Sequence, residues 1–260
     1  MDILVCVKRV PTVGGVITLT ADRQAIDTKA SGFTISPHEE CAVEEAVRLV
    51  ERFGGSVTVV SLGPAAAEEQ LRACLALGAS AAVLIETPEG TETGPIGTAA
   101  ALHAVASAGS FDLVLLGNEA SDTGDYQVGI RLAHLLGRPV ATGIKAITVT
   151  DDGSSLAASR TYRGVLETFT LPLPCVVTVK EGINLPRYPS LPGRLRAKRA
   201  GVTRMPPGTV PPSQGPAAGD LRMISLRVPD APQKQAAVLG HGVAAVPALV
   251  SVLEQLGVAR

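Results

Sequence analysis

The chain has 260 residues, of which 46% are hydrophobic and 18% charged, and its 23 Lys+Arg against 24 Asp+Glu give a net charge of −1. This near-neutral balance, together with only 3% aromatic residues, argues against the basic surfaces and stacking platforms that bind nucleic acids. With 27 glycines and 19 prolines, the combined glycine and proline content stays below the roughly 25–30% that is typical of disordered, low-complexity chains. Most of the chain is therefore expected to fold.

The chain opens directly with a strand-like run at residues 3–7. No charged segment and no cleavable apolar segment precede this run, so no export is expected and the protein is predicted to be cytoplasmic. The longest uncharged window, residues 235–253, contains glycines and a proline and is not expected to span a membrane. The cysteines lack metal-ligand spacing and have apolar neighbours, which predicts buried free thiols and no metal site: they are Cys6, Cys41, Cys74 and Cys175.

Strand-like and helix-like segments alternate over the first 136 residues. Short runs rich in Val, Ile and Leu are typical of strands buried on both faces of a sheet; they lie at residues 3–7, 57–61, 81–85 and 113–116. Helices are expected between them, at residues 39–53, 65–77 and 97–108. The first helix has a predicted capping box, with Ser36 as N-cap, Pro37 at N1 and Glu39 at N3. The alternation predicts an α/β fold with a Rossmann-like parallel sheet.

The pattern changes after residue 136. Four further strands are predicted to add an antiparallel extension, at residues 139–149, 156–162, 165–171 and 175–179. The next segment, 181–199, has little periodicity, and 206–219 is a Pro- and Gly-rich linker. A strand-like run at 222–228 and a helix near 243–256 follow. This tail is too small for a core of its own, so it is expected to form a C-terminal arm that wraps this domain or a partner. The predicted division is therefore a domain at 1–199 and a linker with its arm at 200–260.

The most informative stretch is a buried strand at residues 113–116 that leads into a polar, Gly-containing loop and then a helix from about Gln127. In a parallel sheet such a loop lies at the carboxyl edge, where its backbone N–H groups and the helix N-terminus suit a phosphate. It matches neither a Rossmann fingerprint nor a P-loop, and the missing P-loop lysine argues against ATP hydrolysis. An ordinary capped loop remains the alternative.

Other strand ends and a helix start converge on the same edge. Lys8 and Arg9 follow the first strand and could neutralise a phosphate, while His38 in the first helical turn could face a ligand. No nucleophile elbow, metal-ligand cluster or nucleophile–base pair is visible. The residues thus indicate a binding or carrier protein with no catalytic residue.

Several stretches, in order along nearly the whole chain, resemble the beta subunit of electron transfer flavoprotein. They are residues 5–10, 36–46, 113–129, 171–178 and 184–192, and the tail at 224–233 is similar to the family's wrapping arm. The resemblance implies a heterodimer whose alpha subunit carries the redox-active FAD, while the beta subunit binds AMP or, in electron-bifurcating relatives, a second FAD. It also implies that electrons come from acyl-CoA-type or other flavin dehydrogenases and pass to a downstream quinone-linked oxidoreductase.

Two sets of site residues follow from the resemblance. The nucleotide site would comprise Cys6, Ser36, Pro37, His38, Glu39, Leu62, Asp122, Thr123, Gly124, Asp125, Tyr126, Gln127, Val128, Gly129 and Ile130. A partner-docking loop near 184–199 would have Leu191 as its apolar anchor, with Tyr188 and Pro192 beside it and the cationic run 194–199 next to it.

Departures from the family pattern leave alternatives open. The nucleotide loop ends in Gln127-Val128-Gly129, which is closer to bifurcating members and leaves AMP and a second FAD both possible. Val13 and His38 stand where some relatives place aromatic residues near the alpha-subunit flavin. The two rival functions are a subunit of an electron-bifurcating complex and a stand-alone adenine-nucleotide-binding protein of the universal stress type, which would purify without an alpha subunit.

Overall fold

The computed structural model describes residues 1–12, 14, 17–29, 31–91, 93–205, 224–229 and 237–258. Val13 and the predicted linker at 206–219 lie outside the described residues, as does much of the predicted arm. The described part contains no helix that is long and apolar enough to cross a membrane.

Seven parallel strands form the main sheet, in the order β12-β5-β4-β1-β6-β11-β7. Their bounds are β1 (Asp2–Cys6), β4 (Ser56–Gly63), β5 (Ala81–Glu86), β6 (Leu113–Gly117), β7 (Val140–Ile144), β11 (Cys175–Val179) and β12 (Thr203–Met205). The central strands β1, β6 and β11 are almost entirely buried, which accounts for their continuous apolar sequences. The predicted Rossmann-like α/β fold is confirmed.

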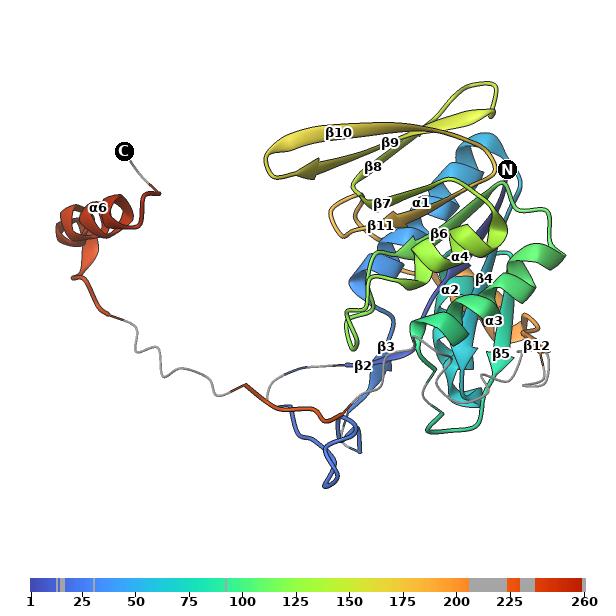
Figure 1. The fold of residues 1–260 in the computed structure, drawn as a ribbon, viewed down its shortest axis with the longest axis horizontal. Coiled ribbons are helices and arrows are strands. Elements are labelled where there is room, and N and C mark those ends of the chain that lie inside the picture. The colour runs from blue at the N-terminus through green and yellow to red at the C-terminus, as the bar shows by residue number, and fades with distance from the viewer. Residues whose placement is uncertain are drawn as a thin grey trace.

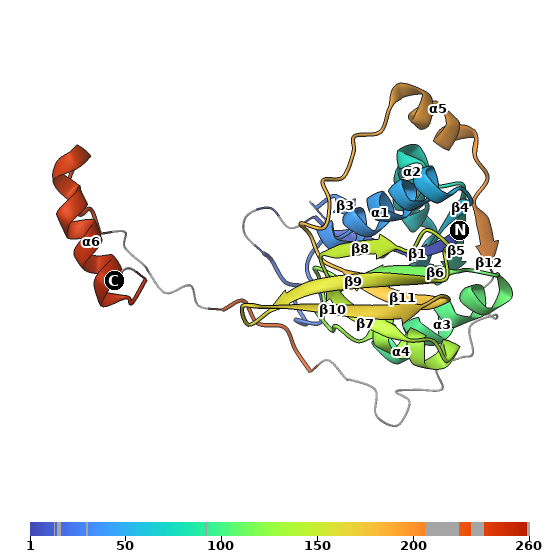
Figure 2. The ribbon, with the colours of Figure 1, turned by 90° about the horizontal axis from the view of Figure 1, so that it is seen from above.

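Helices cover both faces of this sheet (Figures 1 and 2). One face carries α1 (Pro37–Phe53) and α2 (Glu68–Leu77), the latter preceded by the 3₁₀ turn η1 (Ala65–Ala67). The other face carries α3 (Pro95–Ala108) and α4 (Val128–Leu136). Two apolar cores result, one on each face of the sheet. Because the strands are parallel, their carboxyl ends all lie at the same edge of the sheet.

The antiparallel strands form a separate sheet, with the order β10-β9-β8. Its strands are β8 (Ala146–Val149), β9 (Ser155–Tyr162) and β10 (Val165–Pro172). The predicted strand at 139–149 is divided: β7 pairs in parallel with β11 in the main sheet, and β8 pairs with β9. Gly143, with a φ of +69°, lies at an irregularity in the β7–β11 pairing; Ile144 still pairs with Val179, and the division comes after it. A short ribbon, β2 (Val10–Pro11) with β3 (Phe33–Thr34), completes the strands of the described residues.

The segment that showed little periodicity contains a helix, α5 (Leu191–Arg199). Ser190 caps it by accepting the Gly193 N–H at 3.1 Å, and Gly193 lies so close to α2 that a Cβ there would be 2.4 Å from Ala76 O. The chain then returns to the main sheet as its edge strand β12, so this sheet includes residues beyond 199.

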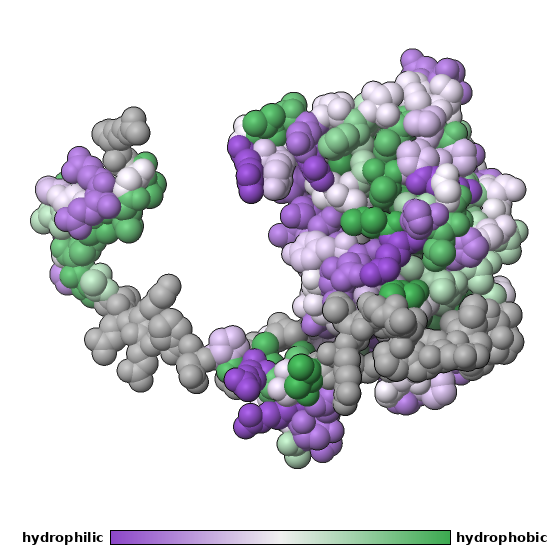
Figure 3. Space-filling view, in the orientation of Figure 1, coloured by the Kyte–Doolittle hydropathy of each residue, from purple (hydrophilic) through white to green (hydrophobic). Residues whose placement is uncertain are grey.

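The C-terminal helix predicted near 243–256 is present as η3 (Gly242–Ala245) and α6 (Val246–Gln255). It stands apart from the α/β domain in both ribbon views (Figures 1 and 2), and none of its residues is buried. Figure 3 shows hydrophobic side chains on its surface. The strand-like run predicted at 222–228 is wrong for residues 224–228, which form no strand, although Leu226 N–H donates to Arg23 O at 2.8 Å.

Candidate functional site

The first turn of α1 lies directly over the end of β6. A Cβ at Gly117 would be 2.8 Å from Glu39 Cγ and 3.1 Å from His38 Cβ. Only glycine leaves room for this approach. The approach brings the start of α1 next to the loop between β6 and α4, residues 118–127, as their positions at the sheet edge predicted.

Ser36 connects the start of α1 to this loop. Its Oγ accepts the Ser121 N–H at 3.1 Å and lies 3.4 Å from Ser121 Oγ. Its own N–H donates to Glu39 Oε2 at 3.1 Å, within the predicted capping box. One serine therefore caps a helix and positions the candidate phosphate loop.

Lys8 connects the end of β1 to the same loop. Its Nζ lies 2.8 Å from Asp122 Oδ1 and 2.7 Å from Asp122 Oδ2. Both side chains are partly exposed at the mouth of the site. A phosphate bound here would share this ammonium group with Asp122.

Two acidic groups inside the site hold their protons tightly. Burial raises the pKa of Glu39 to about 8, although N–H groups of Lys8 and Ser36 donate to its carboxyl group and lower it. Burial also raises the pKa of the Cys6 thiol far above its ordinary value, and the nearby Glu39 raises it further. At neutral pH this part of the site is therefore mainly uncharged, with Lys8 and Asp122 as the ion pair at its mouth.

His38 is also uncharged at neutral pH. Burial lowers its pKa, while Glu119, whose Oε1 lies 3.9 Å from His38 Nδ1, partly opposes that effect. Among the described residues, Nδ1 has no hydrogen-bond partner although it is buried. Buried polar atoms are rarely left unsatisfied, so Nδ1 is a candidate contact for a bound polar group.

The loop itself is open at its centre and closely packed at its end. Gly124 has a φ of +59°, and a Cβ there would meet no other atom within 4 Å; Tyr126 also has a positive φ. Gly129, in the first turn of α4, would place a Cβ 2.4 Å from Thr178 Cγ2 of β11. Gly129 is thus required for packing α4 on the sheet, whereas Gly124 faces open space. The remaining predicted residues of the segment lie in the loop or the first turn of α4 and are not buried: Asp122, Thr123, Asp125, Gln127, Val128 and Ile130.

Two polar residues of this edge, Asn118 and Thr178, were not singled out in the sequence. Thr178 Oγ1 donates to Asn118 Oδ1 at 2.8 Å and accepts the Gly143 N–H at 3.1 Å. Asn118 N–H also donates to Val179 O at 2.9 Å. These bonds tie the ends of β6, β7 and β11 together. The sequence feature that could have pointed to Asn118 and Thr178 is their position at the ends of apolar runs.

Three buried polar atoms at this edge have no hydrogen-bond partner among the described residues. Besides His38 Nδ1, Ser61 Oγ and Arg9 Nε are buried without a hydrogen-bond partner in the described residues, and the Arg9 guanidinium stacks on Phe33 at 3.2 Å. Ser61 precedes the predicted Leu62, which is half-buried at the end of β4, and Pro37 is exposed at the start of α1. Bound nucleotide or ordered water would satisfy such atoms, and the amides before α4 supply positive ends of peptide dipoles for a phosphate.

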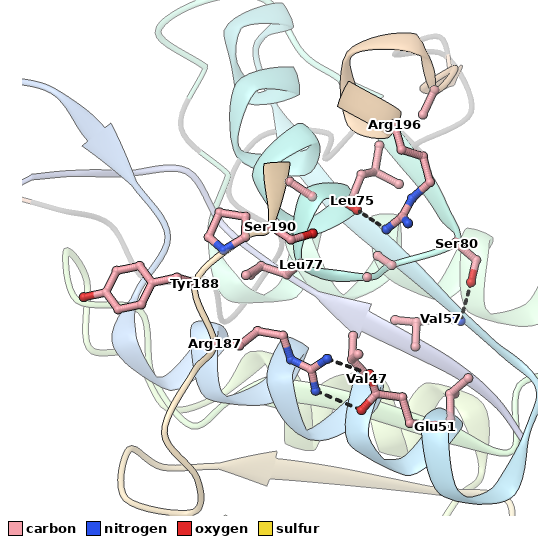
Figure 4. A pocket seen from close by; sticks show the side chains of 16 residues that line it. Val47, Glu51, Val57, Leu75, Leu77, Ser80, Arg187, Tyr188, Ser190 and Arg196 are labelled. Carbon is pink, nitrogen blue, oxygen red and sulfur yellow. Dashed lines mark hydrogen bonds and ion pairs between the residues drawn. The ribbon is translucent and has the colours of Figure 1, made fainter. Parts of the chain in front are cut away.

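The predicted docking residues lie elsewhere, next to a cavity of about 650 Å³ between α1, α2 and residues 187–200 (Figure 4). Val57 and Ser80 line it near the amino ends of β4 and β5, so it opens on the opposite edge of the sheet from the 118–127 loop. Tyr188 and Leu191 are 94% and 71% exposed, and Pro192 is exposed beside them. The cationic run 194–199 belongs to α5.

Comparison with known proteins gives one consistent result. A family model described as "Electron transfer flavoprotein domain" matches residues 25–209. The electron transfer flavoprotein subunit beta of Homo sapiens is 36% identical over 262 residues, covering 99% of this chain and 98% of the relative. The protein of the same name from Bacillus subtilis is 36% identical over 231 residues, covering 88% of each chain. That of Bradyrhizobium diazoefficiens is 38% identical over 202 residues, covering 76% of this chain and 79% of the relative.

Proposed function

Because the chain belongs to the family of electron transfer flavoprotein beta subunits, we propose that it forms a heterodimer with an alpha subunit holding FAD. In that complex it would bind AMP at the carboxyl edge of its sheet. The complex would accept electrons from acyl-CoA-type or other flavin dehydrogenases and pass them to a quinone-linked oxidoreductase. The observation that carries this proposal is the match to named beta subunits over up to 99% of the chain.

The proposed nucleotide site uses residues from four elements. The phosphate would bind the backbone N–H groups of the loop before α4, with Lys8 as its counterion. Ser61 and His38 have buried polar atoms without protein partners among the described residues, and these would bond the rest of the nucleotide. Ser36 would hold the loop in place through Ser121. Such a nucleotide would stabilise the fold by binding only the folded state.

The proposed role is that of a carrier, which needs no general base or nucleophile. The flavin, when bound, supplies the electron-accepting chemistry, and the protein supplies position and electrostatics. The uncharged side chains of His38 and Glu39 at neutral pH keep added charge out of the interior of this edge. Docking would use Tyr188, Leu191 and Pro192, whose exposure and proline-restricted backbone suit a transient contact.

A bifurcating subunit with a second FAD is the alternative that one observation favours. The loop ends in Gln127-Val128-Gly129, as in the bifurcating members that the sequence resembles there. Gln127 accepts hydrogen bonds from Arg131 Nε at 3.1 Å and Nη2 at 2.8 Å, which leaves its amide NH₂ group available to a larger ligand.

The test is co-expression with the alpha subunit of the same organism, followed by purification, denaturation and mass spectrometry of the released nucleotides. One FAD and one AMP per heterodimer are expected. Two FAD and no AMP would replace the simple carrier by the bifurcating alternative. A stable homodimer without flavin would refute the electron-transfer proposal and favour the stand-alone nucleotide-binding protein.

A further inference from the structure

The segment that carries Tyr188 and Leu191 is anchored to α1 at its beginning. Asn184 Nδ2 donates to Cys41 O at 3.0 Å and to Glu45 Oε2 at 2.9 Å. Arg187 follows three residues later, and its backbone N–H donates to Glu44 Oε2 at 3.1 Å. These bonds fix the backbone of residues 184–187 along the helix.

The Arg187 guanidinium joins two carboxylates that lie two helical turns apart on α1. Its Nε lies 2.9 Å from Glu44 Oε2, and Nη2 lies 3.1 Å from Glu44 Oε1. Its Nη1 and Nη2 lie 2.6 and 2.9 Å from the two oxygens of Glu51 (Figure 4). The Glu44 side chain is only 6% exposed, so loss of the guanidinium would leave a buried carboxyl group without its ion-pair partner. Arg187 lowers the pKa of Glu51, and the two glutamates raise the pKa of Arg187.

The same segment is anchored to α2 at its other end. Gly193 packs against Ala76 O, and Arg196 Nη2 donates to Leu75 O at 3.3 Å. Arg72 Nη1 donates to Ala197 O at 2.6 Å and to Ala200 O at 3.2 Å. These contacts hold α5 on α2 independently of Arg187.

Between the two anchors the segment passes beside the cavity of about 650 Å³. Tyr188 is one of the residues that line this cavity, and in Figure 4 its ring points away from Val47, Leu75 and Leu77 on the other walls. The lining also includes Glu51, Arg187 and Arg196, but its apolar part would take up Tyr188 and Leu191 if the backbone were free, because burial of apolar surface is favourable.

We infer that Arg187 is a positioning residue for partner docking: its paired bonds to Glu44 and Glu51 hold the segment so that Tyr188 and Leu191 face outward. The inference rests on the proposed function, in which these side chains contact a flavin dehydrogenase. Without the guanidinium, the segment keeps the anchor on α2, the Asn184 bonds and the single bond from the backbone N–H of residue 187 to Glu44. The outward arrangement then becomes one of several conformations of the segment. Because only a fraction of the molecules holds it, the apparent affinity for the partner falls.

The experiment uses the purified heterodimer and the acyl-CoA dehydrogenase of the same organism, reduced by its acyl-CoA substrate. The variants are Arg187→Met, Arg187→Lys, Glu51→Gln, Arg187→Met/Glu51→Gln and Leu191→Ala. Arg52→Met is the matched control, because it removes one positive charge from α1 at a side chain that is 63% exposed and pairs loosely with Asp151. Measurements are the steady-state KM for the heterodimer, kcat, flavin content and hydrogen exchange of residues 186–199.

The expected result for Arg187→Met is a KM about 10-fold higher, equivalent to ~1.4 kcal/mol, with kcat and flavin content within about 2-fold of wild type. The KM of Arg187→Lys should lie between those of wild type and Arg187→Met, because an ammonium group cannot bond both carboxylates in the same fork geometry. The KM of Arg187→Met/Glu51→Gln should be no higher than that of Arg187→Met alone. Hydrogen exchange should rise in residues 186–192 and not in α1.

A KM for Arg187→Met equal to that of Arg52→Met, while Leu191→Ala raises KM, would overturn the inference and leave the proposed docking surface standing. Faster exchange at residues 186–192 without a change in KM would also overturn it. If the wild-type heterodimer takes no electrons from any flavin dehydrogenase, the proposed function fails, and the docking role of Arg187 fails with it.

Discussion

Lys8 Nζ lies 2.7 Å from Asp122 Oδ2, so the end of the central strand is tied to the loop that precedes α4. Lys8 places a cation beside the loop that we propose to bind the nucleotide phosphate, and Asp122 of that loop is an anion that competes for this cation. Nucleotide binding is therefore expected to depend on both residues, in opposite directions.

Lys8→Met is expected to weaken AMP binding about 10-fold, because a charge-assisted hydrogen bond contributes roughly 1.5–3 kcal/mol and part of it is already given to Asp122. Titration calorimetry of the nucleotide-depleted heterodimer measures this. Asp122→Asn is the companion variant, and it should bind AMP at least as tightly as wild type because Lys8 is released. Equal affinities in all three proteins would contradict this assignment of the phosphate site.

Glu39 predicts a specific pH dependence of stability. Its pKa in the folded protein is about 8, against roughly 4.3 in an unfolded chain. The folded state thus holds a proton that the unfolded state has lost, and stability falls as the pH rises from about 5 to 8. Between pH 6.5 and 8.5, wild type should lose on the order of 1–2 kcal/mol more than Glu39→Gln. Urea unfolding of both proteins at the two pH values provides the comparison, and parallel pH profiles would show that Glu39 is ionised in the folded state.

Gly129→Ala is expected to destabilise the fold by about 1–3 kcal/mol, since its Cβ would meet Thr178 Cγ2 at 2.4 Å. Thr178→Ser removes that methyl group and keeps the hydroxyl that donates to Asn118, so the double variant should recover most of the loss. Urea unfolding at constant pH tests this pair. A destabilised double variant would mean that the collision lies elsewhere. Because of this packing, a bulky side chain at Gly129 disturbs the α4–β11 contact before it reaches any phosphate.

Leu249→Asp, on the exposed helix α6, should leave the unfolding free energy of the isolated chain within about 0.5 kcal/mol of wild type. It should nevertheless reduce the yield of heterodimer at least 5-fold on co-expression, if the unburied apolar face of α6 binds the alpha subunit. Size-exclusion chromatography gives the yield. Glu254→Gln, on the same helix, serves as the control, and a normal yield from Leu249→Asp would remove α6 from the subunit interface.

The parallel sheet could be predicted because burial on both faces leaves a direct mark on the sequence, as in Ile3, Leu4 and Val5. The helix α5 could not be, because the residues it buries are Gly193 and Ala197. Small residues give no hydrophobic periodicity, so the segment was predicted as a docking loop and not as a helix. Its position depends on Ser190 as N-cap and on the close approach of Gly193 to α2.

The candidate nucleotide loop was visible in the sequence because a polar, Gly-containing stretch follows a buried strand. The contacts that shape it were not, since they join residues far apart along the chain. Thr178 and Asn118 are 60 positions apart, and they meet because β11 pairs with β6. Strand order in the sheet is a property of the whole fold, so a local pattern cannot name such partners.

The edge strand β12 also affects whether the main sheet can add a strand from a second copy of this protein. Its described part covers the free side of β5 with three residues, and its Arg204 forms ion pairs with Glu68 at 2.5 Å and Glu86 at 2.9 Å. A short edge strand that carries a charge is a poor template for adding a further strand from another molecule. Loss of Arg204 would remove both ion pairs and the charge from this edge, at a site remote from both the nucleotide loop and the docking segment.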